Sequence, residues 1–523
     1  MCIRSPLHSL PIKRLVTCLL LPFAIGNFAC NSTVAATLQV SNCDDAGSGS
    51  LRDALANAHS GDNIDLSSLT CSTISLKTGE LNVAVDDLTL NGPGAQALKI
   101  AGGLTVPAHR YAVVHHTGHG VLHIEGLAIT DNFATYGYRN KFASRCIEST
   151  GTVDLVSSTI TQCNGGGVFA QGFSARDSTI DHSYQALYTS GGNVSIVNST
   201  ISDNVSYVHC VGLRIGKPNA APSATVLISN STISGNESDT EYESEVNSAG
   251  CIYQPVTISN TTVAFNTGHP GTTIRAGLLI ATTQARIESS IFANNTSLDL
   301  AIASGAHVSG HNNLIMNAPG GVPADTINAD PKLLPLASNG GRTQTHALAT
   351  DSPAIDAGNN LAGLASDQRG TPFVRIAGAG PDIGAFELQP VTTPSVSIGP
   401  GFTGSWFDPA QSGHGLMLEV LPDHRMLAMW FAFNPEGMQQ SWFGGVGTYS
   451  GATATITDVA LPTGGRWIPN FDPNAIVRNP WGTLTITFTD CAHGRVDFNS
   501  VRGYGRGSMN LIRLTQPAGL ACP

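Results

Sequence analysis

Charged side chains are scarce in this chain of 523 residues: Asp, Glu, Lys and Arg make up 12% of it, and aromatic residues another 6%. Glycine is abundant by contrast, with 57 residues. No window holds a sustained apolar period of 3.6 residues, which argues against a helical or leucine-rich solenoid. Low charge with many Gly, Ser, Thr and Asn favours short strands joined by tight turns.

Basic residues are also few, because 26 Lys and Arg stand against 37 Asp and Glu and the net charge is -11. That balance argues against nucleic acid or an anionic lipid surface as a partner. No Cys-x-x-Cys pair occurs, so a thiolate zinc site is not expected. We identify no cofactor. We expect no transmembrane segment in the mature chain, because no later apolar run is long enough to cross a bilayer.

Residues 1–36 are predicted to be an export signal. Basic residues precede an apolar run over 15–25, and the small residues at 34–36 offer a cleavage site. A lipoprotein signal at Cys30 is the alternative, although Asn27 stands where such signals prefer an apolar residue. We therefore expect a secreted protein or one on the outer cell surface.

Eight cysteines remain after the predicted signal, and an even number in an exported chain indicates disulfides. We predict that they pair in sequence order, although spacing alone leaves the other pairings open. The eight are Cys43, Cys71, Cys146, Cys163, Cys210, Cys251, Cys491 and Cys522.

A phrase of two small polar residues and an apolar one recurs through the middle of the chain, at intervals of 20 to 32 residues. Repeats of this length, each built from short strands, predict a stacked solenoid. The clear copies end at Ile160, Ile180, Ile201 and Ile233, and the looser ones at Ile129, Val263 and Ile291.

The phrase predicts its own geometry. The apolar residue and the Ser two places before it lie on one strand face, and the Thr between them on the other. An Asn three places before the apolar end suits a sharp left-handed bend, and an Asn three places after it suits a ladder between coils. The bend residues are Asn198, Asn230 and Asn260; the ladder residues are Asn132, Asn204, Asn236, Asn266 and Asn294. A short helix over 50–58 is predicted to cap the first coil.

Two segments resemble known secreted proteins. Residues 43–94, with Gly49-Ser50-Leu51-Arg52-Asp53-Ala54, resemble the start of bacterial right-handed β-helix proteins. Residues 330–388, with Asn339-Gly340-Gly341-Arg342 and Asp367-Gln368-Arg369-Gly370, are similar to the choice-of-anchor Q domain. The resemblance implies export and a right-handed parallel β-helix over 37–388. It also implies that the 330–388 motif closes the end of this helix, with its Asp and Arg side chains bonding the turns. It does not fix a reaction.

A second domain is predicted after a linker at 389–400. All five Trp lie in 401–523, and alternating residues there predict a small antiparallel β domain. The segment 404–415 resembles the opening of a β domain appended to many secreted proteobacterial proteins. Trp406 and Trp467 are expected to be exposed, because Gly and Pro surround them, and could stack on sugar rings; core packing is the alternative.

Three further groups of residues are site candidates. His115, His119 and His123 could share a strand face and bind a metal, or could be surface histidines at a turn. His182 and Asp203 would lie one strand spacing apart if the coils stay in register, which suits acid–base chemistry on a sugar. Arg176 and Arg214 are candidates for the base of a lyase.

The fold prediction is thus all-β: a right-handed parallel β-helix followed by a small antiparallel β domain. We expect a non-catalytic, adhesin-like protein that binds a polysaccharide, a cell-surface glycan or another surface partner. A polysaccharide lyase or glycoside hydrolase on the same β-helix is the alternative. Carboxylates, or an Arg with carboxylates, converging in one groove would favour the enzyme.

Overall fold

The structure is a computed structural model that describes residues 35–102, 112–131, 145–206, 210–218, 220–221, 223–238, 246–268, 274–317, 320–389 and 396–520. The predicted export signal therefore lies outside the described residues, apart from its last two positions. The chain divides into two compact units, Met1–Gln389 and Pro390–Pro523.

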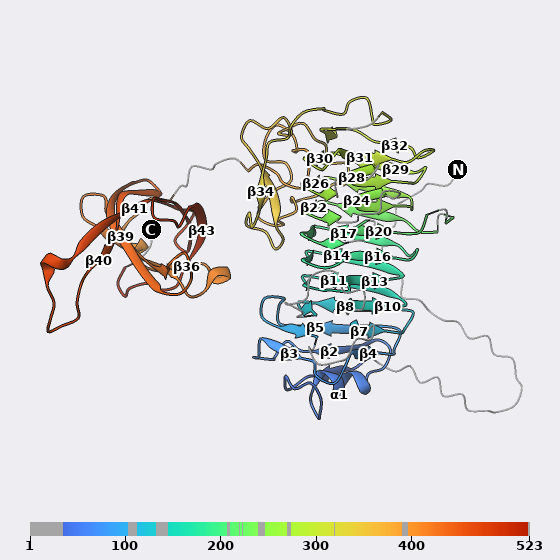
Figure 1. Cartoon of the computed structure of the whole chain (residues 1–523), viewed down its shortest axis with the longest axis horizontal. Helices are drawn as coiled ribbons and strands as arrows, with labels where there is room; N and C mark the ends of the chain where they lie inside the picture. The colour runs from blue at the N-terminus through green and yellow to red at the C-terminus, as the bar shows by residue number, and fades with distance from the viewer. Residues whose placement is uncertain are drawn as a thin grey trace, which may run out of the picture. The chain divides into compact units, whose positions relative to one another are not determined.

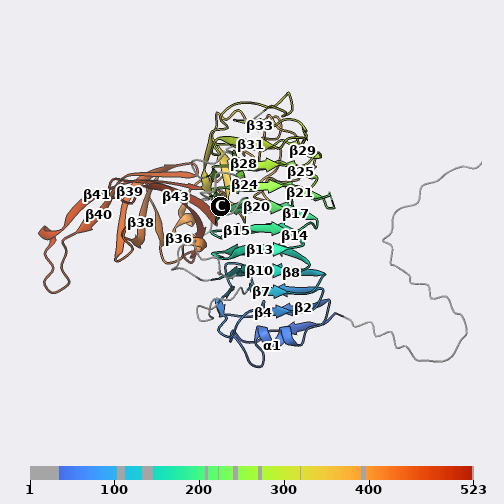
Figure 2. The same ribbon diagram turned by 45° about the vertical axis from the view of Figure 1, so that its right-hand side comes forward.

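Three long parallel sheets, stacked coil upon coil, form the first unit (Figures 1 and 2). Successive strands fall into sheet A, sheet B and sheet C in turn, so each turn of the chain adds one strand to each sheet. This is the repeating path of a parallel β-helix, and the predicted fold class is confirmed.

Sheet A consists of β1 (Thr37–Gln39), β2 (Asp62–Asp65), β5 (Leu88–Asn91), β8 (Val121–Glu125), β11 (Thr152–Val156), β14 (Gly172–Arg176), β17 (Val194–Val197), β21 (Val226–Ser229), β25 (Val256–Ser259), β29 (Ala285–Glu288) and β32 (Val308–Ser309). Sheet B consists of β3 (Thr73–Ser75), β6 (Lys99–Ala101), β9 (Ala128–Thr130), β12 (Thr159–Thr161), β15 (Thr179–Asp181), β18 (Thr200–Ser202), β22 (Thr232–Ser234), β26 (Thr262–Ala264), β30 (Ile291–Ala293) and β33 (Leu314–Ile315). Sheet C consists of β4 (Leu81–Val83), β7 (Ala112–His116), β10 (Arg145–Ser149), β13 (Gly166–Ala170), β16 (Leu187–Thr189), β20 (Leu213–Ile215), β24 (Val246–Ile252), β28 (Ile274–Ile280) and β31 (Leu298–Ile302).

Columns of like apolar residues fill the interior of the solenoid. In sheet B, Ile160 is paired with Ile180, which is paired in turn with Ile201, and each is at most 1% exposed. Burying an aliphatic side chain of this size stabilises a fold by about 1.5–3 kcal/mol. The repeated apolar residue therefore contributes both the core and the alignment of successive coils.

The corner between sheets A and B is a single residue in the left-handed conformation. Asn198, Asn230 and Asn260 have φ of 51°, 53° and 45°, so the predicted bends are confirmed. Ser157 and Asp177 take the same conformation at the equivalent place in earlier coils. Asn is the usual choice there because its side chain tolerates positive φ.

The predicted asparagine ladder is confirmed at Asn204, Asn236 and Asn266. Asn204 Nδ2 donates to Asn236 Oδ1 at 2.9 Å, and Asn236 Nδ2 donates to Asn266 Oδ1 at 2.9 Å. The next rung is Asn295 rather than the predicted Asn294.

The error at that rung comes from strand register. Val263 pairs with Phe292, so Phe292 and not Ile291 is the inward apolar residue of its coil. Asn294 instead lies at the separate bend that follows the sheet B strand, with φ of 59°. Asn132 lies outside the described residues.

Three of the predicted disulfides are present: Cys43–Cys71, Cys146–Cys163 and Cys210–Cys251. Cys491 is also disulfide-bonded, but Cys522 lies outside the described residues. Each of the three described bridges ties segments from neighbouring parts of the solenoid. Bridges of this kind typically stabilise a domain by about 2–4 kcal/mol.

The helix predicted before the first coil is α1 (Leu51–Ala56). Its N-cap Ser50 accepts a hydrogen bond from Asp53 N at 3.2 Å, and Leu51 is buried. The helix packs against β2 and β4 at one end of the solenoid (Figure 1). It thus covers apolar residues of the first coil that have no preceding coil to pack against.

The segment 330–388 lies along the outer face of sheet B, where the outward Thr of the repeat meets it. Thr200 Oγ1 donates to Gln344 O at 2.7 Å, and Thr232 Oγ1 donates to Gln368 Oε1 at 2.6 Å. The expectation that this motif closes the end of the helix is thus corrected: its contacts cross successive coils. The segment contains the strand pair β34 (Leu333–Ala337) and β35 (Thr345–Leu348).

A separate three-stranded sheet of the first unit consists of β19 (Val205–Ser206), β23 (Glu237–Ser238) and β27 (Thr267–Gly268).

Two buried ion pairs hold this flanking segment together. Arg369 lies 2.6 Å from Asp367, and Arg375 lies 2.8 Å from Glu387. Burial raises the pKa of Glu387, although hydrogen bonds from neighbouring backbone amides and the charge of Arg375 oppose that rise. Because both ion pairs join turns of this same segment, we interpret their role as structural.

The second unit is a closed antiparallel barrel of β36 (Gly404–Phe407), β37 (Gly415–Leu421), β38 (Arg425–Phe433), β39 (Gln440–Ser450), β40 (Thr453–Thr463), β41 (Val477–Phe488), β42 (His493–Ser500) and β43 (Arg506–Arg513). Pairing of β36 with β43 closes it. Short 3-10 turns η1 (Pro400–Phe402), η2 (Pro409–Gln411) and η3 (Pro473–Ala475) lie outside the strands. Among the described residues, no helix has the length and apolar character needed to span a bilayer.

The ladder gives a direct test of what holds the coils in register. We expect Asn236→Ala to lower the free energy of unfolding of the first unit by about 3 kcal/mol, because it removes the buried acceptor of Asn204 N and Nδ2 and the buried donor to Asn266 Oδ1. Urea unfolding followed by circular dichroism measures the change. The exposed Asn193→Ala, which removes one surface acceptor, should cost under about 1 kcal/mol. Equal costs for the two variants would contradict a stabilising role for the ladder.

Candidate functional site

The three histidines proposed as a metal site are not brought together. His115 lies on β7 in sheet C and contacts Glu80 at 3.3 Å, whereas His123 lies on β8 in sheet A. His119 occupies the turn between these strands. Among the described residues, no group of three His, Cys, Asp or Glu side chains could hold a metal ion. The prediction that the three histidines share one strand face was wrong, because the chain changes sheets between His115 and His123.

His123 instead forms an ion pair on the outer face of sheet A. Its Nδ1 lies 2.7 Å from Asp154 Oδ2 on the next coil, and its Nε2 lies 3.6 Å from Glu125. The hydrogen bond with Asp154 raises the pKa of His123 above its ordinary value, against the effect of burial. Burial opposes ionisation of Asp154, but hydrogen bonds from His123 and Ser174 outweigh it and lower that pKa.

His182 and Asp203 occupy equivalent places on adjacent coils, as the repeat predicts. Each follows its sheet B strand directly, and both have positive φ. Both side chains are exposed, and His182 contacts the neighbouring Asp181 at 3.4 Å. The predicted positions of the two residues on adjacent coils are therefore confirmed, but the structure does not show them acting as an acid–base pair. Within the described chain no contact links His182 to Asp203.

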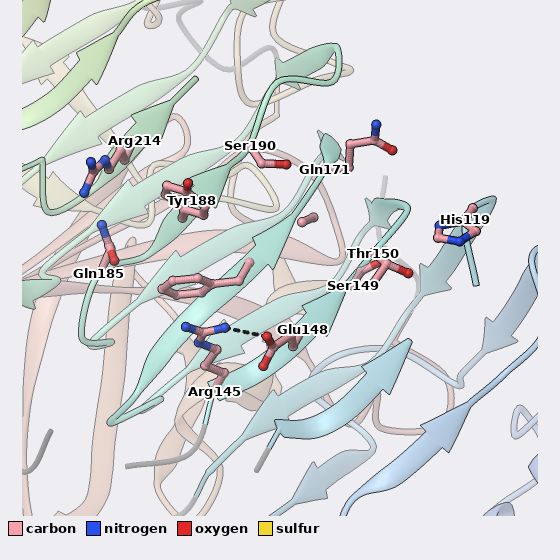
Figure 3. A pocket seen from close by; sticks show the side chains of 12 residues that line it. His119, Arg145, Glu148, Ser149, Thr150, Gln171, Gln185, Tyr188, Ser190 and Arg214 are labelled. Atoms are coloured by element: carbon pink, nitrogen blue, oxygen red, sulfur yellow. Dashed lines mark ion pairs between the residues drawn. The ribbon is translucent and has the colours of Figure 1, made fainter. Parts of the chain in front are cut away.

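Arg214, the other candidate base, lies in a groove on the outer face of sheet C. The groove has a volume of about 780 Å³ and crosses β10, β13, β16 and β20. Figure 3 shows its labelled side chains on neighbouring strands, with Gln185, Tyr188 and Arg214 grouped at one end. Arg176 is not part of it: it is an exposed residue of sheet A.

Strand alternation positions the groove residues. In the triplets Val168-Phe169-Ala170, Leu187-Tyr188-Thr189 and Leu213-Arg214-Ile215, the outer two residues are buried in the solenoid and the middle one points outward. Parallel register then aligns Glu148, Phe169, Tyr188 and Arg214 in one column. Adjacent strands are about 4.8 Å apart, so these four span about 14 Å.

The two aromatic rings of this column lie between two guanidinium groups. Arg145 lies over the ring of Phe169, with Cζ 3.8 Å from its centroid, and forms an ion pair with Glu148 at 2.7 Å. The rings of Phe169 and Tyr188 are 5.5 Å apart. Arg214 Cζ lies 5.6 Å from the centre of the Tyr188 ring. The result is a shallow apolar floor with cationic groups at both ends.

A glycine makes room for this arrangement. Gly166 is the strand partner of Arg145, and a Cβ there would come within 2.2 Å of the Phe169 ring. Its φ of 135° also disfavours any other residue. The ring of Phe169 can therefore lie close to the backbone and beneath Arg145.

Two donors in the groove have no hydrogen-bond partner. Gln185 Nε2 and Arg214 Nε are both buried and unpaired, and Gln185 as a whole is only 6% exposed. Leaving such a group unpaired costs about 1–3 kcal/mol. Both lie beside Tyr188, and both would be satisfied by an acceptor oxygen bound in the groove.

Sequence reasoning singled out Arg214 and missed most of its neighbours. The triplets that carry Phe169, Tyr188 and Arg214 do show the alternation of a half-buried strand, and that signal could have found them. Their alignment across the sheet, however, depends on the number of residues in the connections between the strands of each coil. Gln185 and Arg145 gave no such signal.

The two tryptophans proposed to bind sugar have opposite environments. Trp467 is 86% exposed, as expected. Trp406 is 1% exposed, so the expectation for it was wrong. Its partner across the strand is Leu416, and its Nε1 donates to Phe402 O at 3.2 Å. Trp406 lies in the barrel core because strand alternation, and not the neighbouring Gly, decides which way it points.

No protein-family model matches this chain, and neither a curated protein nor a solved structure was found to match it.

The His123–Asp154 pair predicts a pH dependence. His123 has a raised pKa, so its contribution is complete below its unfolded value of 6.5 and is lost as the pH rises through the folded pKa. Asp154 has a lowered pKa, so its contribution is present above 3.8 and is lost as the pH falls through the folded pKa. We expect His123→Gln to cost about 1 kcal/mol near pH 5.5 and less at pH 9. Urea unfolding at both pH values, with His119→Gln as control, measures this; a cost independent of pH would contradict the pair.

The tryptophans predict a contrast in stability. We expect Trp406→Ala to lower the free energy of unfolding of the barrel by about 3–5 kcal/mol, because it empties a buried site. Trp467→Ala should change it by under about 0.5 kcal/mol, because that side chain is exposed. Thermal unfolding of the two variants tests the contrast, and a comparable loss for both would refute it.

Proposed function

We propose that this protein is an exported, non-catalytic binding protein whose ligand is an acidic glycan held in the groove on sheet C. The observation that carries the proposal is the pair of buried, unpartnered donors, Gln185 Nε2 and Arg214 Nε, beside an aromatic floor. Carboxylate or sulfate oxygens on a sugar supply the acceptors that these donors lack.

The shape of the groove suits an extended ligand. Four strands cross it and its floor carries Phe169 and Tyr188, whose flat faces can stack on sugar rings. The coils beneath are fixed by parallel pairing, so the rings are held in place before the ligand arrives. Such preorganisation reduces the ordering cost of binding.

The local charge supports an acidic ligand despite the net charge of -11. Charges more than about 8 Å apart are largely screened at physiological salt, so the nearest groups decide. Within the described residues Arg214 forms no ion pair, whereas Arg145 is already neutralised by Glu148 at 2.7 Å. Arg214 therefore supplies uncompensated positive charge to the groove.

Binding is favoured over glycoside hydrolysis by the carboxylate count. Hydrolases of this kind need two carboxyl groups flanking the scissile bond. Among the described lining residues Glu148 is the one carboxylate, and Arg145 pairs with it. A lyase is the second candidate, because Arg214 and Tyr188 could take part in proton transfer next to a bound uronate.

We also propose that the protein is exported and that it belongs to the choice-of-anchor Q class. The disulfides are compatible with an oxidising compartment, and the basic and apolar start of the sequence suits an export signal. A rigid solenoid outside the cell would present the groove to polysaccharide.

Titration calorimetry with short oligosaccharides tests the proposal. The panel contains oligogalacturonate, alginate and hyaluronate fragments and neutral cello-oligosaccharides. We expect at least one acidic glycan to bind, with an affinity that falls as salt is added. Arg214→Gln should weaken it about 10- to 100-fold, and Tyr188→Ala about tenfold. The matched control is Arg176→Gln, because Arg176 is an exposed arginine of sheet A outside the groove.

The outcomes separate the candidates. Failure of every acidic glycan to bind, or an Arg214→Gln variant with unchanged affinity, would remove the proposal. Equal losses for Arg176→Gln and Arg214→Gln would show that the groove is not the site. Release of unsaturated product absorbing in the ultraviolet would replace binding by a lyase reaction.

A further inference from the structure

The barrel of the second unit contains a cavity that the glycan groove does not involve. It has a volume of about 300 Å³, at the lower end of the range for small-molecule sites. Eight-stranded barrels are just wide enough to hold one small ligand. The cavity is lined by residues of β38, β39, β41, β42 and β43, together with Gln411, His414 and Tyr504 from the connections between strands.

Six Phe, Tyr and Trp side chains line this cavity, and five of them are buried or half-buried. Trp430, Phe443 and Trp481 are at most 5% exposed, and Phe498 and Tyr504 are half-buried beside them. Phe443 stacks on Trp481 at 4.0 Å, and Phe498 meets Trp430 edge-on at 5.4 Å. Each ring is fixed by its neighbours, so the walls are rigid and mainly apolar.

The two indoles in the cavity differ in their hydrogen bonding. Trp430 Nε1 donates to His414 Nδ1 at 3.1 Å. Trp481 Nε1 is buried and has no partner, although Trp481 is only 1% exposed. A buried indole N–H usually finds an acceptor. The unpaired donor therefore points to an acceptor supplied by a bound molecule.

The polar groups restrict the ligand further. Because Nδ1 of His414 accepts a hydrogen bond, its ring is in the neutral tautomer with the proton on Nε2. Among the described residues lining the cavity there is no Asp, Glu, Lys or Arg. Neither an anion nor a cation would find a counter-charge there.

We propose that the barrel binds a neutral, ring-containing small molecule whose carbonyl or ether oxygen accepts a hydrogen bond from Trp481 Nε1. The ring is held between the aromatic walls, and the single oxygen fixes its orientation. This ligand differs in chemistry from the glycan proposed for the solenoid. The segment 404–415, which resembles the start of an appended β domain, contributes Gln411 and His414 to the lining.

A matched pair of compounds tests this inference on the purified full chain. The probes are 2-acetylnaphthalene and 2-ethylnaphthalene, which share a shape but differ in the carbonyl, and binding is followed by ligand-observed NMR. We expect the ketone to bind about three- to tenfold more tightly than the hydrocarbon. Trp481→Phe keeps a ring and removes the N–H, so it should abolish this preference and leave the hydrocarbon affinity unchanged. Trp467→Phe, at an exposed tryptophan outside the cavity, should preserve both affinities.

Several results would overturn the inference. They are no binding of either compound, equal affinity for the two, or a ketone preference that survives Trp481→Phe. Tighter binding of tetramethylammonium than of the ketone would indicate a cation site and would also overturn it. If circular dichroism shows that Trp481→Phe does not fold, Ala432→Leu, which adds bulk to the lining, is the second variant. It should remove binding of both compounds, and retained binding would contradict the assignment.

Discussion

Hydrogen bonding between successive coils is the constraint on which the rest of the first unit depends. Each strand pairs in parallel with the equivalent strands of the neighbouring coils, so residues at equivalent positions form columns. Inside the solenoid these columns are apolar, and at the corner beside them they form a ladder of Asn204, Asn236 and Asn266. A buried amide in such a ladder is satisfied only if every coil keeps its register, because a shift by one residue would leave unpaired groups on two neighbours.

The same constraint builds the groove. Outward residues of sheet C stand in register only because their inward neighbours do, so the order Glu148, Phe169, Tyr188, Arg214 follows from core packing. A rigid support of this kind holds aromatic and cationic groups at fixed separations. The buried donors of Gln185 and Arg214 are then left without partners, a cost that the stability of the solenoid can sustain and that a ligand would relieve.

The second unit solves the packing problem differently. Its strands are antiparallel and close on themselves, so one face of every strand points into a single interior. Large aromatic residues fill most of that interior, but rigid rings such as those of Trp430 and Trp481 cannot change shape to fill every space between them. The cavity between them is therefore part of the barrel's construction, and the unpaired indole N–H gives it chemical character.

The sequence alone determined the class of the fold, because a repeated Ser-Thr-apolar phrase imposes one strand and one bend per copy regardless of what surrounds it. It also predicted the left-handed Asn198, Asn230 and Asn260. Pairing of the cysteines in sequence order was predicted too, and three bridges confirm it, but the spacing alone left other pairings open. It misplaced Asn294 by one residue, since only the pairing of Val263 with Phe292 reveals the register of that coil. Tertiary structure alone decided that His115 and His123 face different sheets, that Trp406 is buried, and that Arg145, Gln185 and Arg214 share a groove. Those facts depend on the length of each connection and on side-chain packing between strands, neither of which leaves a periodic signal in the chain.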